Sequence, residues 1–165
     1  GVHKLVLFNT HGGNVGLMDV VARELRMRLG MLVYSVSWFN LPLTGADGED
    51  LMARFSAEEQ RFGVHGGQIE TAMMMALKPR LVRQSRAQAF TSTSQGRAAT
   101  HRILGNGKSA KLAWAAQDLN PEGAAGNAAA AKVDDGLALI DAAGRALAEL
   151  LQEIDGLPPD TLRGR

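Results

Sequence analysis

The feature that most constrains the fold is an apolar run that ends at a histidine inside a glycine turn. Leu5–Phe8 are four apolar residues in succession, and Asn9–Asn14 follow with the sequence N-T-H-G-G-N. An unbroken apolar run is typical of a strand covered on both faces, as in a parallel sheet. The glycines allow a tight exit that places His11 beyond the carboxyl end of the strand, where open α/β sheets bind ligands. His11 is therefore a candidate ligand or catalytic residue, or else a loop histidine that caps a backbone group.

A helix and a second strand complete a β-α-β unit. Asn14 is a suitable N-cap, Gly30 predicts the helix end, and apolar residues recur between them at helical spacing, namely Val15, Leu17, Val21, Leu25 and Leu29. Met31–Trp38 is rich in β-branched and aromatic residues and predicts a strand. A right-handed crossover makes the two strands parallel, so His11 and Trp38 share one edge of the sheet. Trp38 then lines a pocket near His11, or it is a core or interface tryptophan.

A second glycine-rich stretch leads into a helix. Gly63–Thr71 reads G-V-H-G-G-Q-I-E-T, and the residues after it predict a helix that stops before Pro79. The open N–H groups of a helix N-terminus favour a carboxylate, so Glu70 is either a dipole complement or a site residue. His11, His65 and Glu70 are the donor types of a hydrolytic Zn or Mn site, but they are too few to complete one.

Composition excludes several classes of protein. The 165 residues are 45% hydrophobic and 21% charged, which suits one globular domain. A net charge of +1, no dense Lys and Arg block and 5% aromatic content argue against nucleic-acid binding. No apolar run approaches a membrane span, and the absence of cysteine excludes disulfides and thiolate ligands. Nothing near Gly1 resembles a signal peptide, so we expect a cytoplasmic protein.

The middle of the chain is less regular. Leu41–Phe62 is rich in loops and resembles a lid or insertion, with a short helix expected over Glu49–Glu59. Arg80–His101 is polar and loop-like, and Lys111–Ala116 is a candidate strand.

The last part of the chain predicts a long helix. Residues 128–154 carry an apolar stripe, which suits a helix that covers the sheet. Gly136 and Gly144 lie inside this helix at a cost of about 1 kcal/mol each relative to alanine, which close contact with a neighbouring helix would explain.

Three motifs, in this order, resemble the creatininase family. Asn9–Asn14 is similar to the family's N-G/T-H-G-G-N motif and His65–Thr71 to its H-A/G-G-x-x-E-T motif. Trp114–Asn127 resembles its tryptophan-containing stretch and G-x-x-G-D-P turn, with Asn127-Ala128 in place of Asp-Pro. The resemblance implies a three-layer α/β/α fold around a mostly parallel sheet. It also implies metal-dependent hydrolysis of a non-peptide or cyclic C–N bond in a small molecule (an amide, formamide or lactam), often by homohexamers.

The resemblance also implies roles for individual residues. His11 matches the family's metal-binding histidine, and His65 matches the histidine that handles substrate and proton transfer. Glu70 matches a family glutamate, which we expect to be a metal ligand. A further family ligand, two residues after the metal histidine, is replaced by Gly13. The expected cofactor is a divalent transition metal (Zn, Mn or Fe), with two ions in the complete protein.

Several positions differ from those that hold creatinine in the family. Gly12 replaces a tyrosine, Arg61 and Phe62 replace a tryptophan and an aspartate, and Val64 replaces an acid. Creatinine is therefore not the expected substrate. We expect Trp38 and Arg61 to contact the substrate, with Arg61 favouring an anionic one by pairing with a carboxylate or phosphate; the alternative for Arg61 is a solvated surface position.

The family's E-x-H pair and bridging aspartate belong to a first half without a counterpart in this sequence. We therefore interpret residues 1–165 as a single creatininase-like domain that is incomplete at its N-terminus. Two functions stay open. The chain is part of a metal-dependent amidohydrolase, active when the missing ligands are supplied, or it is a non-catalytic α/β remnant or interaction module that lacks the full metal site.

Overall fold

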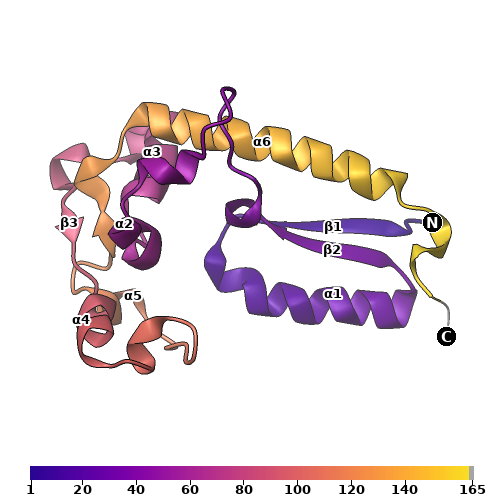
Figure 1. Ribbon diagram of the computed structural model, residues 1–165, viewed down its shortest axis with the longest axis horizontal. Helices are drawn as coiled ribbons and strands as arrows, with labels where there is room; N and C mark the ends of the chain where they lie inside the picture. Colours follow the sequence, from indigo (N-terminus) through magenta and orange to yellow (C-terminus); the bar gives the residue numbers. More distant parts are fainter. Residues whose placement is uncertain (164–165) are drawn as a thin grey trace. The chain divides into compact units, whose positions relative to one another are not determined.

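The computed structural model describes residues 1–163. Its helices and strands are β1 (Lys4–Asn9), α1 (Val15–Leu29), β2 (Leu32–Ser37), α2 (Ala57–Phe62), α3 (Gln68–Leu77), β3 (Ala89–Phe90), α4 (Thr93–Thr100), α5 (Ala116–Leu119), β4 (Gly126–Asn127) and α6 (Val133–Gly156), joined by loops and short 3₁₀ turns (Figure 1). The chain forms two compact units: unit 1 is Gly1–Leu43 with the chain from Asp141 on, and unit 2 is Thr44–Ile140. α6 therefore contributes its first part to unit 2 and its second part to unit 1.

The expected β-α-β unit is present in unit 1. β1 and β2 pair in parallel, with Asn9 opposite Ser37. The residues that follow both strands, including His11 and Trp38, therefore leave the same edge of the sheet, as predicted. α1 ends at Gly30, whose φ of 67° is the left-handed conformation that glycine adopts without strain.

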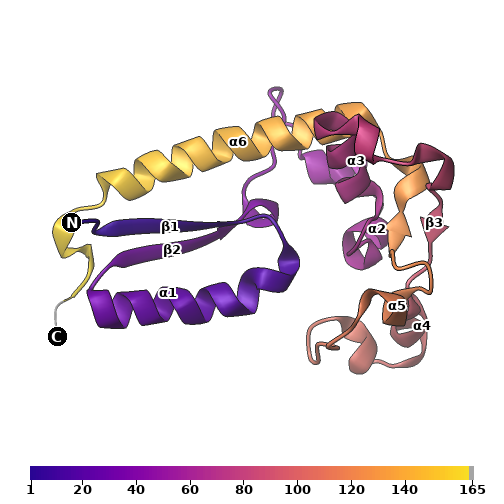
Figure 2. The ribbon, with the colours of Figure 1, turned by 180° about the vertical axis from the view of Figure 1, so that it is seen from behind.

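Unit 1 has three layers. α1 lies on one side of β1 and β2, and the second part of α6 lies on the other side (Figures 1 and 2). Lys4 of β1 donates from Nζ to the carbonyl oxygens of Asp155 and Leu157, where a cation is favourable because helix carbonyls are open there. The predicted α/β fold, with a parallel sheet between helices, is confirmed.

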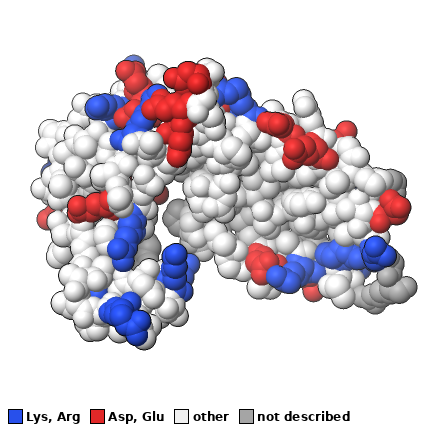
Figure 3. All heavy atoms as spheres, in the orientation of Figure 1, with Lys and Arg blue, Asp and Glu red and all other residues white. Residues whose placement is uncertain are grey.

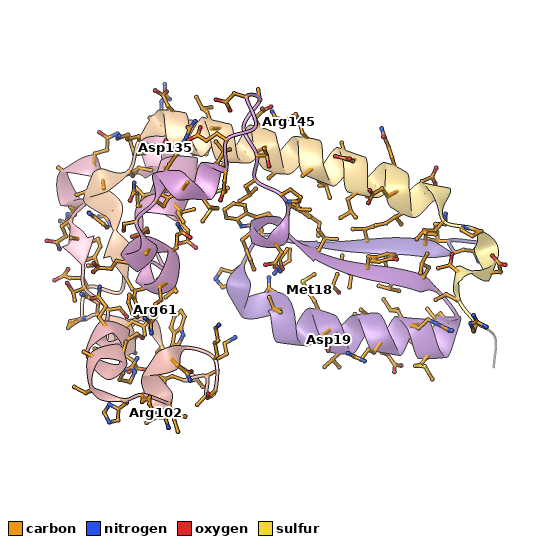
Figure 4. All side chains as sticks on the ribbon, viewed as in Figure 1. Met18, Asp19, Arg61, Arg102, Asp135 and Arg145 are labelled. Carbon is orange, nitrogen blue, oxygen red and sulfur yellow. The ribbon has the colours of Figure 1, made fainter. Side chains whose placement is uncertain are left out.

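The contacts of α1 differ from the simple apolar stripe in the sequence. Half-buried Met18, Ala22 and Leu25 are spaced at about one turn, and Met18 lies on the side toward the strands (Figure 4). No residue of α1 is fully buried, and Leu17 and Leu29 are 69% and 55% exposed. The physical reason is that the sheet of unit 1 has two strands, which cannot cover the whole apolar surface of a 15-residue helix.

Unit 2 contains a small antiparallel pair. β3 and β4 pair through Ala89 with Asn127 and Phe90 with Gly126. His65 forms an isolated antiparallel bridge with Ala125, the residue before β4. The loop that carries His65 is thus attached to the backbone that continues into β4.

Several local predictions for unit 2 are wrong. The helix expected over Glu49–Glu59 is a 3₁₀ turn and then α2, separated at Ser56, whose hydroxyl caps α2. The polar segment expected to be loop-like contains α4. Lys111–Ala116 forms no strand, since the amide of Ala115 donates to the Asp118 carboxylate at 2.8 Å and begins α5 instead.

The two glycines inside α6 have different surroundings. A Cβ on Gly136 would overlap the carbonyl oxygen of Ala72, a fully buried residue of α3, so this glycine permits close helix contact as expected. A Cβ on Gly144 would meet nothing within 4 Å, so the same explanation does not apply there. Within residues 1–163, no helix has the length and apolar character needed to cross a bilayer.

Candidate functional site

The loop that carries His11 is organised by a buried asparagine. Asn9, at the end of β1, is 2% exposed. Its Oδ1 accepts from the backbone N–H of His11 at 3.1 Å and from Nδ2 of Asn14 at 3.3 Å, and its Nδ2 donates to the hydroxyl of Ser37 in β2 at 3.0 Å. Asn9 thus connects the turn to both strands. Asn14 occupies the predicted N-cap position of α1, but its side chain bonds Asn9 and does not cap the helix.

Gly13 makes room for the imidazole. A Cβ on Gly13 would lie 2.9 Å from Cε1 and 3.0 Å from Nδ1 of His11, so the ring rests against this glycine. His11 itself is exposed. At the same sheet edge Trp38 is half-buried and packs edge-on against Phe39, with ring centroids 6.1 Å apart. Unit 1 therefore presents an accessible imidazole and an aromatic pair at the same edge of its sheet.

The second loop, in unit 2, presents His65. Its backbone N–H donates to the carbonyl of Ala125 at 3.3 Å, and the N–H of Ala125 donates back to His65 at 2.7 Å. The imidazole is half-buried and faces the indole of Trp114 at a centroid distance of 6.3 Å. A histidine held by its backbone, with a partly exposed ring, suits proton transfer or ligand binding.

Glu70 stabilises the turn before α3. Its Oε2 accepts from the N–H of Gly66 at 2.7 Å, and Gly66 has a φ of 62° that suits glycine. Glu70 therefore has a structural role at the helix N-terminus, and its exposed side chain lies five residues from His65.

Sequence reasoning missed Glu59, a buried carboxylate of α2 that bonds the end of the His65 loop. Glu59 is 4% exposed; its Oε1 accepts from the N–H of Gln68 at 2.6 Å and its Oε2 from the N–H of Asn127 at 2.8 Å. The pattern Ser56-x-x-Glu59 predicts a capping box, in which the glutamate would bond back to Ser56. No sequence signal pointed to its actual partners, because the fold alone brings Gly63, Gly67 and Gly126 close to the carboxylate.

Arg61 is engaged in contacts within unit 2. Its Nη2 donates to the carbonyl of Gly105 at 2.6 Å, and its guanidinium lies 4.8 Å from the ring centroid of Phe62 (Figure 4). These contacts hold the segment after α4 against α2.

Two cavities flank the His65 loop. A cavity of about 130 Å³ lies beside Glu59, between α2, β3 and α4. The residues that line a second cavity, of about 350 Å³, include Gly66, Glu70, Thr71, Arg83 and Arg86. Two exposed arginines and Glu70 thus line the same cavity.

The charges of unit 2 are unevenly distributed along the chain. Eight Lys and Arg residues, and no Asp or Glu, lie between Thr71 and Gln117. The part of the unit around α4 accordingly shows basic side chains in Figure 3. Such a surface favours an anionic ligand over a cationic one.

One ion pair in unit 2 shifts the pKa values of both of its partners, Glu49 and Arg54. Arg54 bonds the carboxylate of Glu49 at 2.5 Å and reaches that of Asp135, a nearly buried residue at the start of α6, at 3.4 Å (Figure 4). The hydrogen bond from Arg54 lowers the pKa of Glu49, and the same bond raises the pKa of Arg54.

The predicted site residues are divided between the two units. His11 and Trp38 lie in unit 1; Arg61, His65 and Glu70 lie in unit 2. Among residues 1–163, no group of three or more His, Asp or Glu side chains has the geometry to hold a metal ion.

Solved structures first define the class of fold, an α/β fold shared with known amidohydrolases. A putative creatinine amidohydrolase from Bacteroides fragilis NCTC 9343 matches with 22% identity and a TM-score of 0.67, over 96% of this chain and 56% of that chain. A creatinine amidohydrolase (creatininase) matches with 22% identity and a TM-score of 0.61, over 95% and 58%. A structure described as "Creatininase Mn" matches with 22% identity and a TM-score of 0.56, over 90% and 55%.

The family follows from the sequence match. The creatininase family model, described as creatinine amidohydrolase, matches residues 1–151, and the chain belongs to this family. No curated protein matches it. The chain spans a little over half the length of the solved structures it resembles.

Proposed function

We propose that this chain is part of a metal-dependent amidohydrolase that cleaves a non-peptide or cyclic C–N bond in a small molecule. The observation that carries the proposal is membership of the creatininase family across residues 1–151, with the two histidines of its motifs on ordered glycine turns. We further propose that both compact units belong to a single creatininase-like domain and that the protein functions as a homo-oligomer.

We assign the proposed roles to residues on or near the His11 and His65 loops. His11, exposed and held by Asn9, is the proposed metal ligand of unit 1, and Glu70 is the proposed metal ligand of unit 2. His65 transfers a proton to the leaving nitrogen, which must be protonated as the C–N bond breaks. Trp38 contacts the substrate from the sheet edge. We propose that the remaining metal ligands come from outside residues 1–163, as the family resemblance implies.

We propose that the substrate carries an acidic group. Arg61 already contacts Gly105 and Phe62, so Arg83 and Arg86, which line the cavity beside Glu70, are stronger candidates for pairing with a carboxylate or phosphate. The absence of acidic residues between Thr71 and Gln117 supports the same preference.

The second candidate function is a non-catalytic α/β module. It is favoured by one observation, namely that the described residues provide no three-ligand metal group.

Elemental analysis and turnover of the complete protein distinguish the two functions. The amidohydrolase proposal expects stoichiometric Zn, Mn or Fe, activity that chelation removes, and loss of turnover with normal metal content in His65→Ala. An active preparation without transition metal would contradict the metal-dependent proposal. A His65→Ala variant that loses its metal would reassign His65 as a ligand, and a folded preparation with neither metal nor turnover would favour the module.

A further inference from the structure

We infer that Glu59 is a positioning residue for His65, an inference that rests on the proposed role of His65 in proton transfer. The side chain of Glu59 is buried, and each of its two carboxylate oxygens accepts a hydrogen bond from a backbone N–H. These two hydrogen bonds fix the position of the loop that carries His65.

The two donors come from the backbone on both sides of the His65 bridge. Gln68 is three residues after His65, and Asn127 is two residues after Ala125, the bridge partner of His65. Glu59 therefore fastens the end of the His65 loop and the strand to which that loop is paired. Its own backbone is fixed in turn, because the hydroxyl of Ser56 accepts from its N–H at 3.1 Å.

Three glycines shape the space around the carboxylate. A Cβ on Gly63 or Gly67 would overlap Oε1 of Glu59, and a Cβ on Gly126 would lie 3.0 Å from Oε1 and 2.6 Å from the Cα of Gly67. The backbones of these segments approach one another closely only because all three residues lack side chains. The space that remains admits a carboxylate and two N–H groups.

The chemistry of the group matters as well as its shape. An ionised carboxylate only accepts hydrogen bonds, so it can satisfy both N–H donors at once. The amide of glutamine has the same shape but presents an NH₂ group in place of one oxygen, which leaves one backbone N–H unpaired. Glu59→Gln therefore releases one of the two attachments while it preserves packing.

The experiment compares the parent protein, Glu59→Gln and the control Glu58→Gln in the complete, metal-loaded protein. Glu58 is the exposed neighbour on α2, and its carboxylate bonds the side chain of Gln95. In Glu59→Gln we expect amide hydrogen exchange at Gln68 or Asn127 to accelerate at least 10-fold and the ring resonances of His65 to move. We expect kcat to fall about 10- to 100-fold with KM within about 3-fold, because the proton-transfer group is displaced while substrate contacts remain. Glu58→Gln should match the parent in every measurement.

The outcomes separate the inference from the proposed function. A folded Glu59→Gln variant with parent-like exchange and parent-like His65 resonances would overturn the positioning role. If the variant does not fold, exchange in the parent decides: strong protection of the Gln68 and Asn127 amides supports the role, and rapid exchange at both overturns it. Amide exchange and the His65 resonances can be measured without turnover. If His65 proved unnecessary for turnover, the proposed function would be refuted and the test of Glu59 would still stand.

Discussion

At the scale of single residues, both histidine loops depend on a buried polar side chain that is not itself a candidate for chemistry. Asn9 holds the His11 turn with its amide, and Glu59 holds the His65 turn with its carboxylate. Asn9 accepts from one backbone N–H and Glu59 from two, and a backbone N–H that is buried without a partner costs free energy. Buried hydrogen bonds therefore hold the backbone of the two loops that carry the imidazoles.

Asn9→Ala should destabilise the protein because it leaves the N–H of His11 and the hydroxyl of Ser37 without this partner. We expect a loss of about 1–3 kcal/mol in the free energy of unfolding, measured by urea denaturation. Asn40→Ala, at an exposed position of the same unit, should change it by less than about 0.5 kcal/mol. Equal effects of the two substitutions would show that the Asn9 hydrogen bonds contribute little.

At the scale of elements, close contact between α3 and α6 depends on one glycine. Gly136→Ala places a methyl group against the backbone of Ala72, which cannot move without displacing α3. We expect a loss of stability of about 1–3 kcal/mol, as for an overpacked core.

Gly144→Ala is the matched control in the same helix. Its Cβ meets open space, so the helix propensity of alanine should raise stability by up to about 1 kcal/mol. Urea denaturation of both variants tests the pair, and a stabilised Gly136→Ala variant would refute the contact.

The Glu49–Arg54 pair predicts an acid-dependent loss of stability in unit 2. Because the pKa of Glu49 is lowered in the folded protein, the pair stabilises it above the ordinary glutamate pKa. That stabilisation is lost as pH falls from the ordinary value through the lowered one. Arg54→Ala removes the cause, so the midpoint of thermal unfolding should fall less steeply over this acid range than in the parent. An unchanged slope would show that the pair contributes no measurable linkage.

At the scale of the whole molecule, the basic cavity beside Glu70 leads to a prediction about substrate preference. The complete enzyme should hydrolyse amides, formamides or lactams that carry a carboxylate or phosphate and should not turn over creatinine. Arg83→Ala or Arg86→Ala should raise KM for such a substrate about 10- to 100-fold, which corresponds to the loss of a charge-assisted hydrogen bond.

Steady-state kinetics on creatinine and on a panel of acidic and neutral amides test this preference. Arg102→Ala, at an exposed position in the same unit, serves as the control (Figure 4). Efficient creatinine turnover would refute the first half of the prediction, and unchanged KM in both arginine variants would refute the second.

The sequence by itself determined the local features of this protein. The run Leu5–Phe8, the helix that ends at Gly30 and the strand before Trp38 could all be predicted, because apolar periodicity and glycine conformation act over a few residues. The parallel β-α-β unit followed from the same residues, and the family followed from the motifs at Asn9–Asn14, His65–Thr71 and Trp114–Asn127. Lys111–Ala116 shows the limit, since Ala115 at its end begins α5 and does not continue a strand.

Tertiary structure alone decided which polar groups meet. Glu59 bonds residues 9 and 68 positions away along the chain, Arg61 bonds Gly105, and Gly136 lies against Ala72. No local pattern encodes these pairs, because a hydrogen bond or a close backbone contact depends on distances that arise only when distant segments pack. The sequence therefore identified the histidines, and the tertiary structure identified what holds them in place.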